Sequence, residues 1–163
     1  MKIFIASDHA GFHLKRQLIQ YLKVKGLEVE DLGAFELDEE DDYPDFIHPL
    51  ALRVAKDNSQ GKLSFGIVIG GSGQGEAIVA NKVNGIRAAV INSANPQIPR
   101  LAKEHNDANV LALGARFLTP DEAKRAVTLW LDSKFEGGRH ERRLRKIKGI
   151  EDNKDIEEIK GIK

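Results

Sequence analysis

Apolar residues in this chain form short unbroken runs that alternate with stretches in which they recur every three or four positions. An unbroken run rich in β-branched residues is typical of a strand that is covered on both faces. The clearest run, Phe65–Ile69, ends abruptly at Gly70 and Gly71 and is predicted to be a central strand. A weaker run, Glu28–Leu32, mixes its apolar residues with acids and is expected at an edge. The predicted strands are 2–7, 28–32, 65–69, 86–91 and 109–113.

The stretches between these runs have helical spacing. Leucines recur every four residues between positions 14 and 22, and Thr119–Glu122 is a capping box in front of another apolar face. Asn95 and Pro96 are expected to be the cap and the first-turn proline of a further helix. Strands that alternate with helices indicate right-handed βαβ units. We therefore expect an α/β fold, a Rossmann-like three-layer αβα sandwich around a five-stranded parallel sheet.

The central run leads into a glycine-rich turn, residues 70–75, and then into a helical stretch that begins near Glu76. Such a turn leaves backbone N–H groups unpaired beside the positive end of a helix, and glycine lets a ligand approach them closely. An anion is the expected ligand. Three familiar glycine motifs do not fit. The lysine of a P-loop is missing, the glycines are spaced by two and not as in a dinucleotide fingerprint, and Gln74 stands where the hydrolase elbow requires glycine.

Glu76 falls in the first turn of that helix, where a carboxylate interacts favourably with the helix dipole and needs no further explanation. The same carboxylate would also face whatever the loop binds, as a general base beside N–H donors. In an open parallel sheet the ligand crevice lies beyond the carboxyl ends of the strands. A lone histidine at a strand end is often only a core or cap residue. Here the residues expected in one crevice are Asp8, His9, the loop 70–75, Glu76, His105, Asn106 and Arg116.

Composition narrows the functional classes. The 163 residues are 41% hydrophobic and 31% charged, which suits one well-buried domain and is too short for two of ordinary size. Basic and acidic residues balance at 25 each, so the net charge favours neither nucleic acid nor an anionic membrane as a partner. The absence of cysteine excludes disulfides, thiolate metal sites and a cysteine nucleophile. No apolar run approaches the ~18 residues of a membrane span, and a soluble cytoplasmic protein is expected.

Charged segments mark the limits of the expected domain. Residues 36–42 contain six acids and are expected to form a solvated loop. No metal site is expected, because acids at ligand spacing do not cluster outside that run. The domain is expected to span residues 1–148, and the lysine- and glutamate-rich tail 149–163 is expected to be frayed or weakly helical, and dispensable.

A basic helix is predicted at residues 138–148. Arg139 and Arg143 are four residues apart, so their two guanidinium groups fall on one face, from which they could fork onto a phosphate. A solvated basic helix has the same pattern. The sequence alone leaves both readings open.

Several of these segments together resemble the ribose-5-phosphate isomerase type B family, whose fold is shared by the galactose-6-phosphate isomerase subunits. The resemblance runs in one colinear order over roughly residues 1–148 and is more specific than any single motif. The motifs that carry it are Asp8-His9-Ala10-Gly11, Asp42-Tyr43-Pro44, Gly70 to Glu76, Ala80-Asn81-Lys82, Glu104-His105-Asn106-Asp107, and Glu136 to His140 with Arg143.

The resemblance implies reversible aldose–ketose isomerisation of a phosphorylated sugar through a cis-enediolate, without a cofactor. In many members the base is a cysteine at the end of the third strand, and this chain has Gly70 there. A branch of the family lacks the cysteine and uses a glutamate after the glycine loop, and Glu76 matches that branch. Ribose 5-phosphate is the expected substrate, and allose 6-phosphate or galactose 6-phosphate is the alternative. A binding module without turnover is disfavoured, because a pure anion binder gains nothing from carboxylates beside its phosphate.

The resemblance also assigns roles to residues. Glu76 would move the proton, His105 would open the sugar ring, and Ser72 would hold the enediolate together with the N–H groups of Gly71, Gly73, Gln74 and Gly75. Asp8 and Asn106 would hold sugar hydroxyls, and Tyr43 would form a wall of the site. His9, Arg116, Arg139 and Arg143 would bind the phosphate. In the family the C-terminal helix crosses to a second subunit, which implies a homodimer or a dimer of dimers with shared sites.

Overall fold

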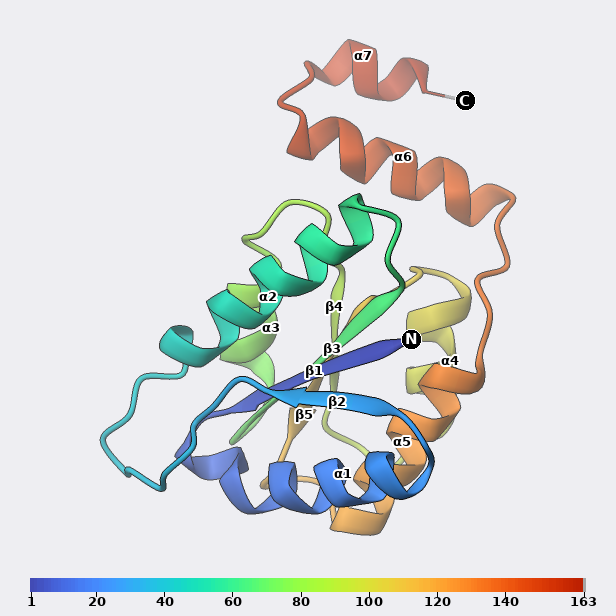
Figure 1. Ribbon diagram of the computed structural model, residues 1–163. Helices are drawn as coiled ribbons and strands as arrows, with labels where there is room; N and C mark the ends of the chain where they lie inside the picture. The colour runs from blue at the N-terminus through green and yellow to red at the C-terminus, as the bar shows by residue number, and fades with distance from the viewer. Residues whose placement is uncertain (163) are drawn as a thin grey trace.

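All five strands of the sheet run in the same direction (Figure 1). The computed structural model describes residues 1–162. Its strands are β1 (Lys2–Ser7), β2 (Glu28–Asp31), β3 (Ser64–Gly70), β4 (Ala88–Ile91) and β5 (Val110–Gly114), in the order β2-β1-β3-β5-β4. The prediction of a parallel sheet with 65–69 inside and 28–32 at an edge is confirmed. β3 is buried along its whole length, as its unbroken apolar run indicated.

Two layers of helices cover the sheet because successive side chains of each strand point to opposite faces. Ile3 and Ile5 of β1 pack with α1 and α5, whereas Phe4 and Ala6 pack with α2 and α3. The helices are η1 (His9–Gly11), α1 (Phe12–Val24), α2 (Pro44–Ser59), α3 (Gln74–Ala80), α4 (Gln97–Glu104), α5 (Pro120–Asp132), α6 (Arg139–Glu151) and α7 (Ile156–Gly161).

Helix starts follow the predicted caps with one displacement. Thr119 accepts from the Glu122 amide in a complete capping box at the start of α5, as predicted. In α4 the N-cap residue is Pro96, not Asn95, so the helix starts one residue later than predicted. Asn95 still caps this end, because its Oδ1 accepts a hydrogen bond from the Gln97 amide at 3.0 Å.

The C-terminal helices α6 and α7 lie outside the three layers, at the top of Figure 1. The predicted basic helix is present, but it continues through Glu151, so the expected boundary at residue 148 falls inside it. Glu151 ties α6 to the body by accepting from the Gly85 amide at 2.9 Å. The tail forms a short helix with its own capping box between Asp155 and Glu158, and its dispensability stays a prediction. Within residues 1–162 no helix combines the length and apolarity needed to cross a membrane.

Gly11 seats the start of α1 on the end of β3. A Cβ at this position would lie 2.5 Å from the carbonyl oxygen of Ile69 and 2.7 Å from its Cγ2. We expect Gly11→Ala to lower the free energy of unfolding by about 1–3 kcal/mol in a urea titration, because the backbone must shift to admit the methyl group. Gly161→Ala is the matched control, since a Cβ there meets nothing within 4 Å. Equal stability of the two variants would contradict this packing.

Candidate active site

The carboxyl ends of three neighbouring strands bring the predicted crevice residues together. Ser7 of β1 pairs with Ile69 of β3, and Gly70 pairs with Gly114 of β5. Asp8, the glycine loop 71–75 and Arg116 follow these strands directly, so they lie at one edge of the sheet.

Asp8 is buried directly after the end of β1. Its side chain is buried, and Oδ1 accepts a hydrogen bond from the Gly11 amide at 3.0 Å. Burial raises the pKa of Asp8, although the bond from Gly11 and the neighbouring His9 oppose that effect. Because one of its oxygens is committed to the backbone, the carboxyl group has a fixed orientation at the end of β1.

Glu76 points back over the end of β3. It is only 4% exposed, and a Cβ at Gly70 would lie 1.9 Å from Glu76 Oε1. The carboxylate therefore fills the space into which any side chain at position 70 would project. Burial raises the pKa of Glu76, and the negative charge of Asp8 adds to the effect. A buried carboxyl group with a raised pKa is suited to taking up and returning a proton.

The glycine loop is enclosed by two side chains from other segments. The ring of Tyr43 lies against Gly75, where a Cβ would come within 2.9 Å of the phenol oxygen. The guanidinium of Arg116 lies against Gly71, 3.3 Å from the corresponding position, and the Arg116 amide donates to the Gly71 carbonyl at 3.1 Å. Ser72 Oγ accepts from the Gln74 amide at 3.3 Å. Tyr43 and Arg116 thus both lie against the glycine loop, and their roles in binding stay predictions.

His9 is held by a residue of the acidic run. Its Nδ1 lies 2.6 Å from Asp41 Oδ1, which also accepts from the His9 amide at 3.1 Å. The hydrogen bond to Asp41 raises the pKa of His9, the charge of Asp8 acts in the same direction, and Arg116 opposes them. The expectation that residues 36–42 form only a solvated loop is wrong for Asp41, whose side chain is 6% exposed.

His105 and Asn106 do not share this crevice within one chain, contrary to the sequence analysis. They follow α4 and precede β5, and the connection from a helix to the next strand lies at the amino ends of parallel strands. The register from Gly66–Val110 to Gly70–Gly114 separates the two edges by roughly 13 Å. The prediction placed His105 and Asn106 in the crevice because they are close to β5 in the sequence. They precede the amino end of β5, however, whereas the crevice lies at the carboxyl ends of the strands.

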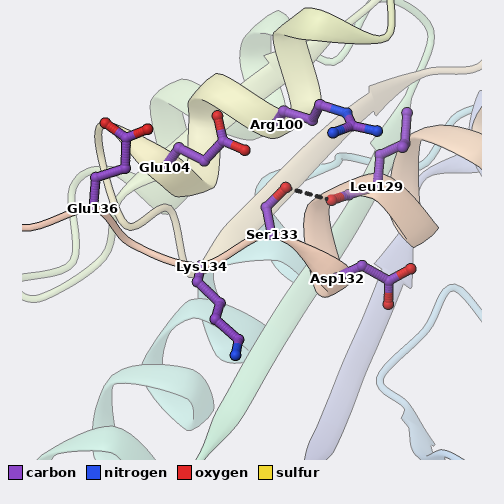
Figure 2. A pocket seen from close by; sticks show the side chains of 7 residues that line it. All are labelled: Arg100, Glu104, Leu129, Asp132, Ser133, Lys134 and Glu136. Carbon is purple, nitrogen blue, oxygen red and sulfur yellow. Dashed lines mark hydrogen bonds between the residues drawn. The ribbon is translucent and has the colours of Figure 1, made fainter.

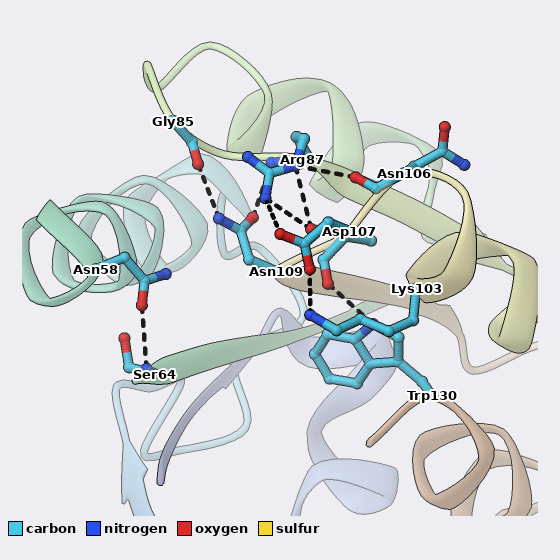
Figure 3. Close-up of polar contacts among 10 residues, drawn as sticks. Asn58, Ser64, Gly85, Arg87, Lys103, Asn106, Asp107, Asn109 and Trp130 are labelled. Carbon is cyan, nitrogen blue, oxygen red and sulfur yellow. Dashed lines mark hydrogen bonds and ion pairs between the residues drawn. The ribbon is translucent and has the colours of Figure 1, made fainter. Parts of the chain in front are cut away.

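A polar network fixes the loop that carries His105 and Asn106 (Figure 3). Arg87 donates to the Asn106 carbonyl at 2.9 Å and to Asp107 Oδ2 at 2.9 Å. Lys103 pairs with the same Asp107 carboxylate, whose residue has a positive φ of 42°. Asn109 completes the network, donating to the Gly85 carbonyl and accepting from the Arg87 amide, both at 2.8 Å. The polar contacts that hold this loop therefore come from residues outside the crevice.

His105 stacks on His140, with ring centroids 4.1 Å apart and planes 13° from parallel. Glu136 Oε2 lies 3.8 Å from Nε2 of His105 and 3.7 Å from that of His140. Burial lowers the pKa of His140, and the neighbouring His105 and arginines of α6 add to the effect. The nitrogen and oxygen atoms of these three residues lie within 4.8 Å of one another, but lone pairs in two parallel rings do not converge on one ion.

Glu136 also lines an open hollow of about 350 Å³ between α4 and the end of α5 (Figure 2). The amide of Glu136 donates to the Glu104 carbonyl at 3.0 Å, which fixes the path of the chain toward α6. The hollow contains charges of both signs and none of the crevice residues, so it offers no coherent ligand site. It is lined by Arg100, Glu104, Leu129, Asp132, Ser133, Lys134 and Glu136.

Arg139 and Arg143 lie in α6, apart from His9 and Arg116. Arg139 Nε lies 3.4 Å from Nε2 of His140, which in turn stacks on His105. The two arginines are exposed, and they lie near His105, at the edge of the sheet formed by the amino ends of the strands. Within one chain the predicted site residues thus form two groups, one at each edge.

A family model described as Ribose/Galactose Isomerase matches residues 3–147. The chain belongs to the ribose/galactose isomerase family. It is 45% identical to the probable ribose-5-phosphate isomerase B of Mycoplasma genitalium over 145 residues, which are 89% of this chain and 92% of that relative. It is 41% identical to ribose-5-phosphate isomerase B of Escherichia coli over 154 residues, 94% and 99% of the two chains.

Solved structures of family members have the same fold. The crystal structure of ribose-5-phosphate isomerase B from Mycoplasma genitalium with bound ribulose-5-phosphate gives a TM-score of 0.87 at 44% identity, covering 93% of this chain and 96% of that one. The Clostridium thermocellum ribose-5-phosphate isomerase B gives 0.83 at 48% identity, covering 94% and 99%. The family resemblance stated from the motifs is confirmed, and the roles of individual residues stay predictions.

Three residues of this family member escaped the sequence analysis as individual candidates, namely Asp41, Glu136 and His140. Asp41 is one of the six acids in residues 36–42 and has no local feature that singles it out. Glu136 and His140 are four residues apart but flank two glycines, so no regular helix signalled that they share a face. The motif from Glu136 to His140, which contains Gly137 and Gly138, was the feature of the sequence that could have identified them.

The raised pKa of Glu76 predicts a stability difference with a defined sign. A carboxyl group with a folded-state pKa above its unfolded value binds its proton more tightly in the folded protein, so stability falls as pH rises from the unfolded through the folded pKa. Glu76→Gln cannot ionise. We expect this variant to need more urea for unfolding than the parent at about pH 8 and an equal amount at about pH 4. Glu39→Gln, at an exposed position, should show no such pH-dependent gain.

Proposed function

We propose that this protein interconverts ribose 5-phosphate and ribulose 5-phosphate, with Glu76 as the base. The observation that carries the proposal is the buried Glu76 carboxylate, which lies over Gly70 at the mouth of the glycine loop. The ribose-5-phosphate isomerase B relatives, at 41–48% identity, support the reaction class. The bound ribulose-5-phosphate in the Mycoplasma genitalium structure supports the product.

The assignment of Glu76 in place of a cysteine base rests on the space above position 70. In members that use cysteine, the base projects from the position that is Gly70 here. In this chain the Glu76 carboxylate reaches the same space from the first turn of α3, and only glycine at position 70 leaves room for it. Glycine at 70 and glutamate at 76 are thus a matched pair, which supports the cysteine-free branch of the family.

The proposed chemistry is a proton transfer between adjacent carbons. Glu76 takes the proton from C2 of the open-chain aldose as the C1 oxygen gains charge. A proton then passes from the C2 hydroxyl to the neighbouring C1 oxygen, and Glu76 returns its own proton to C1, which leaves the carbonyl group at C2 of the ketose. A proton next to a carbonyl is a weak acid, so fixed donors must stabilise the enediolate. Ser72 and the N–H groups of the glycine loop are suited to this task, and Asp8 to a sugar hydroxyl. The phosphate, bound at His9 and Arg116, orients the reacting carbons.

A second chain is proposed to complete each site. His105, Asn106, Arg139 and Arg143 lie at the sheet edge away from Glu76, and α6 projects from the three layers (Figure 1). In a homodimer, or a dimer of dimers, these four residues of one chain would face the crevice of the other. His105 would then protonate the ring oxygen of the cyclic sugar, and the two arginines would close on the phosphate.

The test of the reaction is an NMR assay with ribose 5-phosphate in D₂O, without added metal or nucleotide. We expect ribulose 5-phosphate to form, with deuterium from the solvent bound to its C1. Parallel samples with allose 6-phosphate and galactose 6-phosphate test the six-carbon alternatives. Turnover of none of the three sugars would overturn the enzymatic function and leave the binding module.

Glu76→Gln should lose ~10²–10⁴-fold in kcat with little change in KM, because a positioned base contributes about that much while the amide keeps the size of the side chain. Gly70→Ala is the second variant, since its methyl group would push the Glu76 carboxylate out of position while Glu76 itself is still present. Its kcat should fall as well. Glu39→Gln, in the exposed acidic run, is the control. An unchanged kcat in Glu76→Gln would remove Glu76 from the mechanism.

Hybrid dimers test the shared site. We expect mixtures of Glu76→Gln and Arg143→Ala proteins to regain up to about a quarter of the parent activity per site after subunit exchange, because each hybrid dimer contains one site with both native residues. The measurement is the rate with ribose 5-phosphate before and after mixing, with exchange verified by mass spectrometry. Absence of recovery after verified exchange would assign Arg143 to the crevice of its own chain.

A further inference from the structure

The connection between β2 and α2 is fixed at both ends and reaches the crevice at Asp41 and, just before α2, at Tyr43. Lys15, buried beneath the start of the connection, donates to Asp31 Oδ1 at 2.7 Å and to the Ala34 carbonyl at 2.6 Å. Pro44 begins α2 at the other end. Between these anchors, residues 35–40 and 42 are exposed, and Asp41 alone turns its carboxylate inward.

Asp41 has an unusual environment for a member of an acidic run. Oδ1 accepts from both the amide and Nδ1 of His9, whereas Oδ2 is buried and has no hydrogen-bond partner among the described residues. A buried carboxylate with an unpaired oxygen is costly unless a positive charge compensates it. The imidazolium form of His9 is the compensating charge that lies in contact with it.

The other charged groups around His9 have opposing effects. Asp8 precedes it in the chain and favours the imidazolium, whereas Arg116, beyond β5, disfavours it. A bound phosphate would favour it further. Without Asp41, the ring would therefore lie between one carboxylate and one guanidinium, and its charge near neutral pH would depend on the ligand.

We infer that Asp41 is a positioning residue of the phosphate site, which holds the ring of His9 by its hydrogen bond to Nδ1 and favours the protonated ring before the substrate arrives. The inference rests on the proposed function, in which His9 binds the phosphate. Protonated in advance, His9 presents an N–H donor and a positive charge to the phosphate together with Arg116. The ligand then does not have to recruit a proton as it binds.

The inference predicts a change in pH dependence with a defined sign. A histidine with a raised folded-state pKa keeps its proton to higher pH, and Asp41→Asn removes the cause of the rise but keeps a hydrogen-bond acceptor. We expect the KM of Asp41→Asn for ribose 5-phosphate to rise about tenfold at about pH 8, because less of His9 is protonated in the variant than in the parent, and less than about threefold at about pH 6. kcat should change less than KM, because Asp41 does not contact the reacting carbons.

The decisive measurement is a ¹⁵N NMR titration of the His9 ring in the free protein, repeated with saturating inorganic phosphate. We expect His9 to titrate at lower pH in Asp41→Asn than in the parent, and phosphate to raise it more in the variant. Asp41→Glu should restore part of the shift. Glu40→Gln, the exposed neighbour, is the matched control and should titrate like the parent.

The outcomes separate this inference from the proposed function. A His9 titration that is unchanged in Asp41→Asn overturns the inference, whatever the enzymatic activity. If His9 titrates at lower pH in Asp41→Asn but the KM of this variant does not rise between about pH 6 and 8, the link between His9 protonation and phosphate binding is overturned. If the parent protein has no isomerase activity, the proposed function fails, and the free-protein titration with inorganic phosphate still decides the role of Asp41.

Discussion

The common direction of the five strands is the constraint that governs where chemistry can occur in this molecule. Every connection from a strand to a helix emerges at one edge of the sheet, and every connection from a helix to a strand at the other. Asp8, Glu76 and Arg116 belong to the first kind, whereas His105 belongs to the second. Because the two edges are roughly 13 Å apart, the proposed reaction, which uses both groups, calls for a second chain. The proposed shared site would in this sense be a consequence of the topology.

At the crevice, stability and reactivity oppose each other. Glu76 is buried and near the carboxylate of Asp8, which makes its ionised form costly and raises its pKa, as its proposed role as a base requires. The protein tolerates the arrangement because Gly70 adds no bulk beneath the carboxylate and because α3 fixes its backbone. A more solvated carboxyl group at this position would stabilise the fold and would be a weaker base.

How far the sequence predicted these features depended on the range of the interactions behind them. The buried run of β3, the capping box at Thr119 and the glycine loop each follow from neighbouring residues, and all three were predicted. The pairing of His9 with Asp41 joins positions 32 residues apart, and nothing local distinguishes Asp41 from the acids beside it. The prediction that His105 lies in the crevice was wrong for a different reason. Its helix and strand were predicted correctly, but the direction of the strand, not the distance along the chain, decides the edge.

The residues proposed to bind the phosphate are held by different parts of the chain. His9 and Arg116 are held by the sheet, by Asp41 and by the glycine loop, so they are in place in a single chain. Arg139 and Arg143 lie on α6, which is tied to the body near its two ends, by Glu136 to Glu104 and by Glu151 to Gly85. In the proposed dimer a phosphorylated ligand would contact His9 and Arg116 of one chain and α6 of the other chain. A ligand that bridges two chains binds the dimer more tightly than the monomer, so by linkage phosphate binding and chain association must strengthen each other.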